Sequence, residues 1–190
     1  MSEHETDMRK ETTMRILGAL LLIASMQCWS AGERDPGDHF FNQTLGDFSE
    51  ELEIAREDGK TAILIMFEMD ECPFCHRMKQ TVLNQPEVQH FYRENFLIFP
   101  VDIEGDVEIT TFKGKVSSEK DFAFKGNRVR ATPVFAFFDL DGNPIKRARF
   151  TGATNGPDEF LWLGEFVKNG TYKEMSFTRY KRQRKAGKDG

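Results

Sequence analysis

A continuous apolar run leads directly into a pair of closely spaced cysteines. Residues 61–67 read TAILIMF, a short run with β-branched members that is typical of a strand buried on both faces of a sheet. Cys72-Pro73-Phe74-Cys75 follows, and apolar residues then recur at helical spacing as far as Leu83. We therefore expect a buried strand, a short loop that ends at Cys72, and a helix that begins there.

The rest of the chain alternates helical and strand-like patterns. We expect helices over 48–58, 86–95, 119–125 and 158–168, strands over 96–101, 134–140 and 145–150, and a loop or small hairpin over 103–118. Asp141-Gly142-Asn143 is a turn sequence, so the last two strands should form a hairpin. Strands that alternate with helices, followed by a late hairpin, predict an α/β sandwich with a mixed central sheet. With 18 Phe, the chain can fill such a core.

The first 30 residues have the pattern of a secretory signal peptide. Arg9, Lys10 and Arg15 precede an apolar run over 16–26 that is too short to span a bilayer comfortably, and Ser30 follows it. We expect cleavage after Ser30, hence an exported protein, with an uncleaved membrane anchor as the alternative. Cys28 raises a lipoprotein alternative, which Gln27 before it disfavours.

Three further segments follow the signal in this division of the chain. Residues 31–44 are polar and contain Gly and Pro, so we expect a linker. Residues 45–170 hold the predicted α/β domain. Residues 171–190 form a basic C-terminal tail that contains KRQRK, which we expect to be a disordered, solvated end. Contact with anionic lipid or an acidic partner is the alternative for this tail.

Composition excludes several classes of protein. The formal net charge of −5 argues against general nucleic-acid binding, because phosphate contacts require a basic field. Three cysteines are too few for a fold held together by disulfides. A zinc site at Cys72 and Cys75 needs four ligands, and no second C-x-x-C exists to supply the others. We therefore expect no metal.

The position of Cys72 at a helix start suits redox chemistry. Unpaired N–H groups and the helix dipole favour an anion there, and the thiolate is the attacking form of cysteine. Cys75 lies one helical turn later, within reach of the Cys72 sulfur, and Pro73 fits the first turn. Phe74 is expected to be exposed as a contact surface for another protein. A purely structural disulfide, or His76 as a general base, are the alternatives at this motif.

Thr132-Pro133 stands directly before the strand predicted over 134–140. A proline is tolerated at the first residue of a strand, so an ordinary trans proline is one interpretation. The sequence alone does not set the isomer of this bond.

Together these motifs resemble the thioredoxin superfamily. Three stretches are similar to the SoxW-type thioredoxin-related proteins of the bacterial periplasm: 66–106, 112–143 and 150–167. The first of them contains the CPFC motif. The resemblance covers roughly residues 45 to 170. It implies a thioredoxin fold and thiol–disulfide exchange, with Thr132-Pro133 as the cis-proline loop.

The resemblance also implies roles for individual residues. Cys72 would be the nucleophile and Cys75 the resolving thiol, while Pro73, Phe74, Thr132 and Pro133 would contact the substrate. The implied activity is reduction of disulfides in periplasmic partner proteins, with a membrane thiol–disulfide electron donor and no cofactor. We expect a monomer that does not bind nucleic acid. A disulfide oxidant or isomerase, or a non-catalytic binding module, are the alternatives.

The chain departs from the family at the strand before the motif. Many thioredoxins carry a buried acid six places before the first cysteine, and here that place is Met66. Glu68 lies two residues later on the same face of the expected strand. Glu68 is a candidate proton acceptor that could take the place of that acid, and a solvated carboxylate at the strand end is the alternative.

Overall fold

The computed structural model describes residues 32–187. These residues belong to one compact unit, Gly32–Gly190. The expected signal peptide and the lipoprotein alternative at Cys28 lie outside the described residues. Among the helices between residues 32 and 187, none has the length and apolar character needed to cross a membrane.

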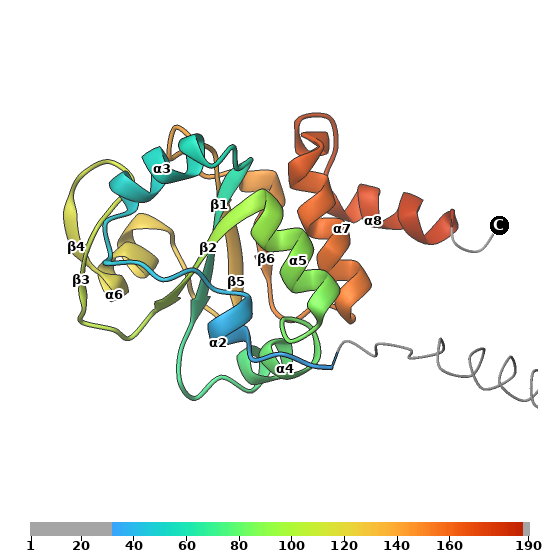
Figure 1. Ribbon diagram of the computed structural model, residues 1–190, viewed down its shortest axis with the longest axis horizontal. Helices are drawn as coiled ribbons and strands as arrows, with labels where there is room; N and C mark the ends of the chain where they lie inside the picture. The colour runs from blue at the N-terminus through green and yellow to red at the C-terminus, as the bar shows by residue number, and fades with distance from the viewer. Residues whose placement is uncertain (1–31, 188–190) are drawn as a thin grey trace, which may run out of the picture. The chain divides into compact units, whose positions relative to one another are not determined.

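A mixed four-stranded sheet forms the centre of the domain (Figure 1). Its strands lie in the order β2–β1–β5–β6, with β1 at Ala62–Glu68, β2 at Phe96–Asp102, β5 at Val134–Phe138 and β6 at Phe150–Thr151. β1 is parallel to β2 and antiparallel to β5, and β6 is antiparallel to β5. β1 is therefore central, and its first six residues are buried, as a continuous apolar strand predicts.

Helices cover both faces of this sheet, so alternate strand residues enter different cores. Leu64 and Met66 pack with helices α4 (Pro73–Thr81), α5 (Pro86–Asn95) and α7 (Pro157–Lys168). Ile63 and Ile65 pack with α3 (Phe48–Glu57) and with the segment after α6 (Glu119–Asp121). The expected α/β sandwich is confirmed.

Helices α5 and α7 are in close contact on the first of these faces. The ring of Tyr92 stacks on that of Phe160 with centroids 4.4 Å apart, and its hydroxyl donates a hydrogen bond of 2.6 Å to the Phe160 carbonyl oxygen. Burial raises the pKa of Tyr92 well above its usual value. A Cβ atom on Gly164 would lie only 2.5 Å from Cε1 of Phe91, so glycine is needed at this contact.

Two short elements lie between β2 and β5. Strands β3 (Glu108–Thr110) and β4 (Val116–Ser118) form an antiparallel hairpin, which confirms the hairpin expected within 103–118. The helix predicted over 119–125 is present as α6 followed by a π-helical turn over Phe122–Gly126.

The strand predicted over 145–150 is mostly wrong. The hairpin is present next to its turn, where Pro144 pairs with Phe138 and the N–H of Ile145 donates to the Phe137 carbonyl oxygen at 2.8 Å. Residues Lys146–Ala148 then form a 3-10 turn, and pairing with β5 resumes at Phe150 and Thr151. Ile145 and Ala148 are both buried. Their spacing of three residues suits a helical turn, whereas a strand would bury alternate residues.

The segment expected as a linker packs on the domain. It contains α2 (Pro36–His39), and Phe40 is completely buried beside Tyr92 and Phe160. The N–H of Asn42 donates to the carbonyl of Ile98 at 2.8 Å, and its Oδ1 accepts from the Ile98 N–H at 2.9 Å. The segment thus covers the free edge of β2.

The described part of the C-terminal tail, residues 171–187, is largely helical, contrary to expectation. A 3-10 turn over Thr171–Lys173 leads to helix α8 (Phe177–Ala186), which begins at the capping residue Ser176. Phe177 packs against Phe166 of α7, and Lys181 forms an ion pair of 2.7 Å with Glu159. These contacts hold α8 beside α7 (Figure 1). The sequence pattern did not predict them, because basic residues outnumber the apolar ones in this segment.

Candidate functional site

Cys72 and Cys75 form a disulfide at the start of α4, with an S–S distance of 2.09 Å. Cys72 is the N-cap residue of the helix, and its Sγ accepts a hydrogen bond of 3.1 Å from the N–H of Cys75. Both cysteines are 2% exposed. When the pair is reduced, the same N–H group and the helix dipole favour negative charge on Cys72.

The residues between the cysteines have different surroundings. Pro73 occupies the first turn of α4, where its missing N–H leaves no helical hydrogen bond unmade. Phe74 is 54% exposed, an unusual exposure for a large apolar side chain, and the guanidinium carbon of Arg77 lies 5.4 Å from its ring centre. An apolar surface bordered by a cation thus lies next to the disulfide.

The Thr132-Pro133 peptide bond is cis. Val134 pairs with Phe67 at the end of β1, and β1 leads within a few residues to Cys72. The carbonyl oxygen of Pro133 accepts a hydrogen bond of 2.8 Å from the N–H of Gly152, just after β6. Topology therefore brings the cis bond and the cysteine motif to the same end of the sheet.

Glu68 lies on the last position of β1 and is ion-paired. Its Oε2 is 2.7 Å from Nζ of Lys79 on α4, and its side chain is 15% exposed. Met66, which occupies the place of the family's buried acid, is completely buried. The Glu68 carboxylate, which lies two residues from Met66 along β1, is thus paired with the Lys79 ammonium group of α4, the helix that carries Cys75.

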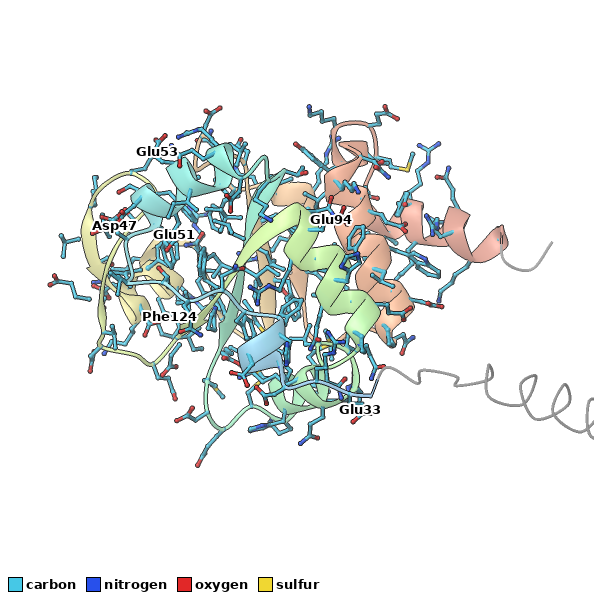
Figure 2. All side chains as sticks on the ribbon, in the orientation of Figure 1. Glu33, Asp47, Glu51, Glu53, Glu94 and Phe124 are labelled. Carbon is cyan, nitrogen blue, oxygen red and sulfur yellow. A yellow bond between two sulfur atoms is a disulfide. The ribbon has the colours of Figure 1, made fainter. Side chains whose placement is uncertain are left out.

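Glu68 and Lys79 line a hollow of about 830 Å³. His76 and Gln80 of α4 form one side of this hollow, and the segment from Glu33 to Thr44 forms another. Glu33 lies beside α4 in Figure 2. The hollow gives the Glu68 carboxylate access to solvent on the side away from the core.

His76 contacts the loop before the motif. Its Nε2 lies 3.0 Å from the carbonyl oxygen of Asp70, which links the first turn of α4 to the end of the loop that follows β1.

The sequence did not predict a contact between Met78, one helical turn after Cys75 on α4, and Thr154. Sδ of Met78 on α4 is 3.4 Å from the N–H of Thr154 and 3.6 Å from its hydroxyl, and both residues are buried. This contact joins α4 to the loop after β6. No sequence signal distinguishes such a methionine from an ordinary core residue.

The structure brings no metal-ligating cluster together between residues 32 and 187. No group of three or more His, Cys, Asp or Glu side chains in this range is arranged to hold a metal ion.

The family profile described as a thioredoxin-like domain matches residues 48–168. Among curated proteins, none matches the chain significantly.

Solved structures with the same fold match most of the domain. A thioredoxin-fold protein from Helicobacter pylori is 23% identical with a TM-score of 0.54, covering 67% of this chain and 82% of that one. A DsbH oxidoreductase is 20% identical with a TM-score of 0.52, covering 69% and 88%. A putative disulphide-isomerase from Bacteroides thetaiotaomicron is 21% identical with a TM-score of 0.51, covering 76% and 100%. At these sequence identities the similarity to the solved structures concerns the fold alone. The family profile covers residues 48–168, and the chain therefore belongs to the thioredoxin-like domain family.

Proposed function

We propose that this protein is a thiol–disulfide oxidoreductase of the SoxW type that reduces disulfides of partner proteins in the periplasm. One observation carries the proposal. Cys72 and Cys75 share a disulfide at a helix start, and the cis Thr132-Pro133 bond lies at the same end of the sheet.

The reaction begins with the reduced pair. The Cys72 thiolate attacks one sulfur of the partner's disulfide, forms a mixed disulfide and releases the partner's other sulfur as a thiolate. Cys75 then loses its proton and attacks Cys72. This second step breaks the mixed disulfide, releases the reduced partner and leaves the Cys72–Cys75 disulfide. Two electrons pass from the pair to the partner.

The residues around the disulfide provide a surface for the partner chain. Thr132 directly precedes the cis proline, and its backbone groups would pair with an extended segment of the partner, a form of strand addition. Pro133 shapes that groove. Pro73 and the exposed ring of Phe74 would contact the partner on the other side of the sulfurs. The site needs no cofactor for this exchange.

The Glu68 carboxylate is the proton acceptor in this proposal. It lies at the end of β1 on the face that carries Met66, and it opens to a solvent-accessible hollow. Lys79 holds the carboxylate in place. A proton taken from Cys75, directly or through water, can leave through the hollow.

Regeneration of the dithiol requires an electron donor. A membrane protein of the thiol–disulfide interchange type would supply two electrons to a monomer of this protein after each cycle. Run in reverse, the same steps pass two electrons from the partner to the Cys72–Cys75 disulfide and make the protein an oxidant. The direction depends on the reduction potential, for which ~30 mV corresponds to about 1.4 kcal/mol.

The activity can be tested with insulin, whose reduction by dithiothreitol is followed by turbidity. The wild-type chain should accelerate the reaction, and the Cys72→Ser variant should not. A measured reduction potential distinguishes a reductant from an oxidant. If a Cys72→Ser/Cys75→Ser variant complements a deletion strain fully, the protein is a binding module and the proposal is wrong.

A further inference from the structure

A second hollow lies away from the cysteines, along β5. Its volume is about 420 Å³, and its walls include Ala136 and Phe137 of that strand. At a strand rise of about 3.3 Å per residue, Ala136 is about 10 Å from Pro133. The hollow exists because the chain after Ile145 leaves the sheet as a 3-10 turn and returns only at Phe150. It is therefore distinct from the proposed substrate groove.

The charged residues that line this hollow are all basic. They are Arg128 from the loop after the π-helical turn, and Lys146 and Arg149 from the 3-10 turn and its end. No aspartate or glutamate lines it. The all-basic lining departs from the overall charge balance of the chain, which has 31 Asp and Glu against 26 Lys and Arg. We call this hollow the cationic pocket.

None of these three cations has a partner within the described part of the chain. No hydrogen bond or ion pair among residues 32–187 uses the side chain of Arg128, Lys146 or Arg149. Neighbouring arginines behave differently. Arg130 donates to the carbonyl oxygen of Val129 at 2.8 Å, and Arg147 donates to that of Lys173 at 3.0 Å. Arg130 and Arg147 therefore hydrogen-bond to the backbone, whereas the three cations that line the pocket do not.

Arg149 is exposed to solvent overall, and only part of its side chain is shielded. Burial lowers the pKa of its guanidinium from the usual value, and no carboxylate offsets this effect. An anion that binds next to a partly desolvated cation without a counter-charge stabilises the charged form of that cation.

The backbone at Arg128 is strained. Its φ of 52° is the only positive value for a non-glycine residue within 32–187. The π-helical turn over Phe122–Gly126 precedes it, and the Asn127 side chain caps that turn by donating to the Phe122 carbonyl oxygen at 3.0 Å. Left-handed conformations of this kind cost free energy and are concentrated at ligand-binding sites. Here the conformation accompanies an arginine that lines the pocket.

We propose that the cationic pocket binds a small tetrahedral oxyanion with two negative charges, phosphate or sulfate. Guanidinium groups match the oxygen spacing of such anions and form paired, charge-assisted hydrogen bonds with them. The volume falls within the range of small-molecule sites. The site is independent of the redox reaction, since none of its residues belongs to the cysteine motif or the cis-proline loop.

The test is a titration of the full oxidised chain with sodium sulfate and with inorganic phosphate at low ionic strength, followed by amide NMR. Saturable shifts are expected at Gly126, Arg128 and Ala136. The Arg128→Gln/Lys146→Gln/Arg149→Gln variant should bind at least about tenfold more weakly, because charge-assisted hydrogen bonds are lost. A Cys72→Ser/Cys75→Ser variant should bind as the wild type does, which separates this site from the proposed redox function.

The matched control is Arg179→Gln/Arg182→Gln/Lys185→Gln on α8. It removes the same charge at exposed positions outside the pocket, and binding should change less than about twofold. Thermal unfolding checks that each variant is folded. If the pocket variant does not fold, Lys146→Gln and Arg149→Gln are measured singly, and each should weaken binding several-fold. Non-saturable shifts, or equal weakening by the pocket and α8 variants, would overturn the proposal.

Discussion

The Glu68 carboxylate and the Lys79 ammonium group form an ion pair of 2.7 Å that joins the end of β1 to α4. Met66, two residues earlier on the same face, pairs in register with Pro100 of β2. The position of the family's buried acid and the adjacent position across the sheet are therefore both without charge. A charged pair occurs instead at the strand end, where the helix that bears Cys75 supplies the cation.

This arrangement predicts a specific defect in the Glu68→Gln variant. Loss of the proposed proton acceptor should slow resolution of the mixed disulfide by about 100-fold near neutral pH, and by less at alkaline pH, where Cys75 ionises unaided. Quenched-flow measurement of mixed-disulfide decay, with Asp70→Asn as the matched control, gives the two rates. An unchanged rate for Glu68→Gln would show that the carboxylate takes no part.

Removal of the exposed ring next to the disulfide should affect protein substrates alone. Because Phe74 is 54% exposed, Phe74→Ala should leave the unfolding midpoint unchanged, while KM for a protein disulfide should rise about tenfold, as expected for an apolar contact of this size. Steady-state reduction of insulin and of a small aromatic disulfide provides the comparison. Equal losses with both substrates would mean that Phe74 does not contact the partner.

The C-terminal helix should contribute to stability. Phe177 is 9% exposed and packs against Phe150 and Phe166. Phe177→Ala should lower the free energy of unfolding by about 3 kcal/mol, the lower end for a buried phenylalanine. Urea denaturation measures the change, with Thr178→Ala at an exposed position of α8 as the control. A loss below about 0.5 kcal/mol would mean that α8 is only loosely attached.

Acid should weaken the start of α3 through Asp47, its N-cap residue (Figure 2). The hydrogen bond from the Ser49 side chain, followed by that from the Glu50 N–H, lowers the pKa of Asp47. The unfolded state therefore binds this proton more tightly. The associated stability is present above about pH 4 and is lost as the pH falls through the lowered pKa.

Asp47→Asn provides the measurement, because asparagine also caps helices but does not titrate. The difference in unfolding free energy between wild type and Asp47→Asn should decrease as the pH falls from about 6 to about 2. A constant difference across this range would contradict the assigned cause.

Much of the architecture could be predicted because the relevant patterns are local. The run over 61–67 and the recurring apolar residues of α5 and α7 placed those elements to within a few residues. The strand predicted over 145–150 had no such local pattern. The conformation of this segment depends on burial of Ile145 and Ala148 against elements distant in the sequence. The tail was misjudged because two aromatic anchors on α8 are outnumbered by cations.

The candidate site was predictable in part for the same reason. Cys72, Cys75 and Pro133 occur in motifs whose positions follow from the strands beside them. The cis isomer of Pro133 was expected from the resemblance and is confirmed. The Lys79 partner of Glu68 and the Met78 contact with Thr154 depend on residues far apart in the sequence. Local patterns carry no information about such pairings.

The most direct test of the central claim is to trap the reaction intermediate. A Cys75→Ser variant, expressed as the full chain, leaves Cys72 able to attack but removes the thiol that resolves the mixed disulfide. Non-reducing electrophoresis and mass spectrometry of periplasmic extracts should identify partner proteins joined through Cys72, and these adducts should be absent from a Cys72→Ser/Cys75→Ser variant. Recovery of no adduct through Cys72 would contradict the account.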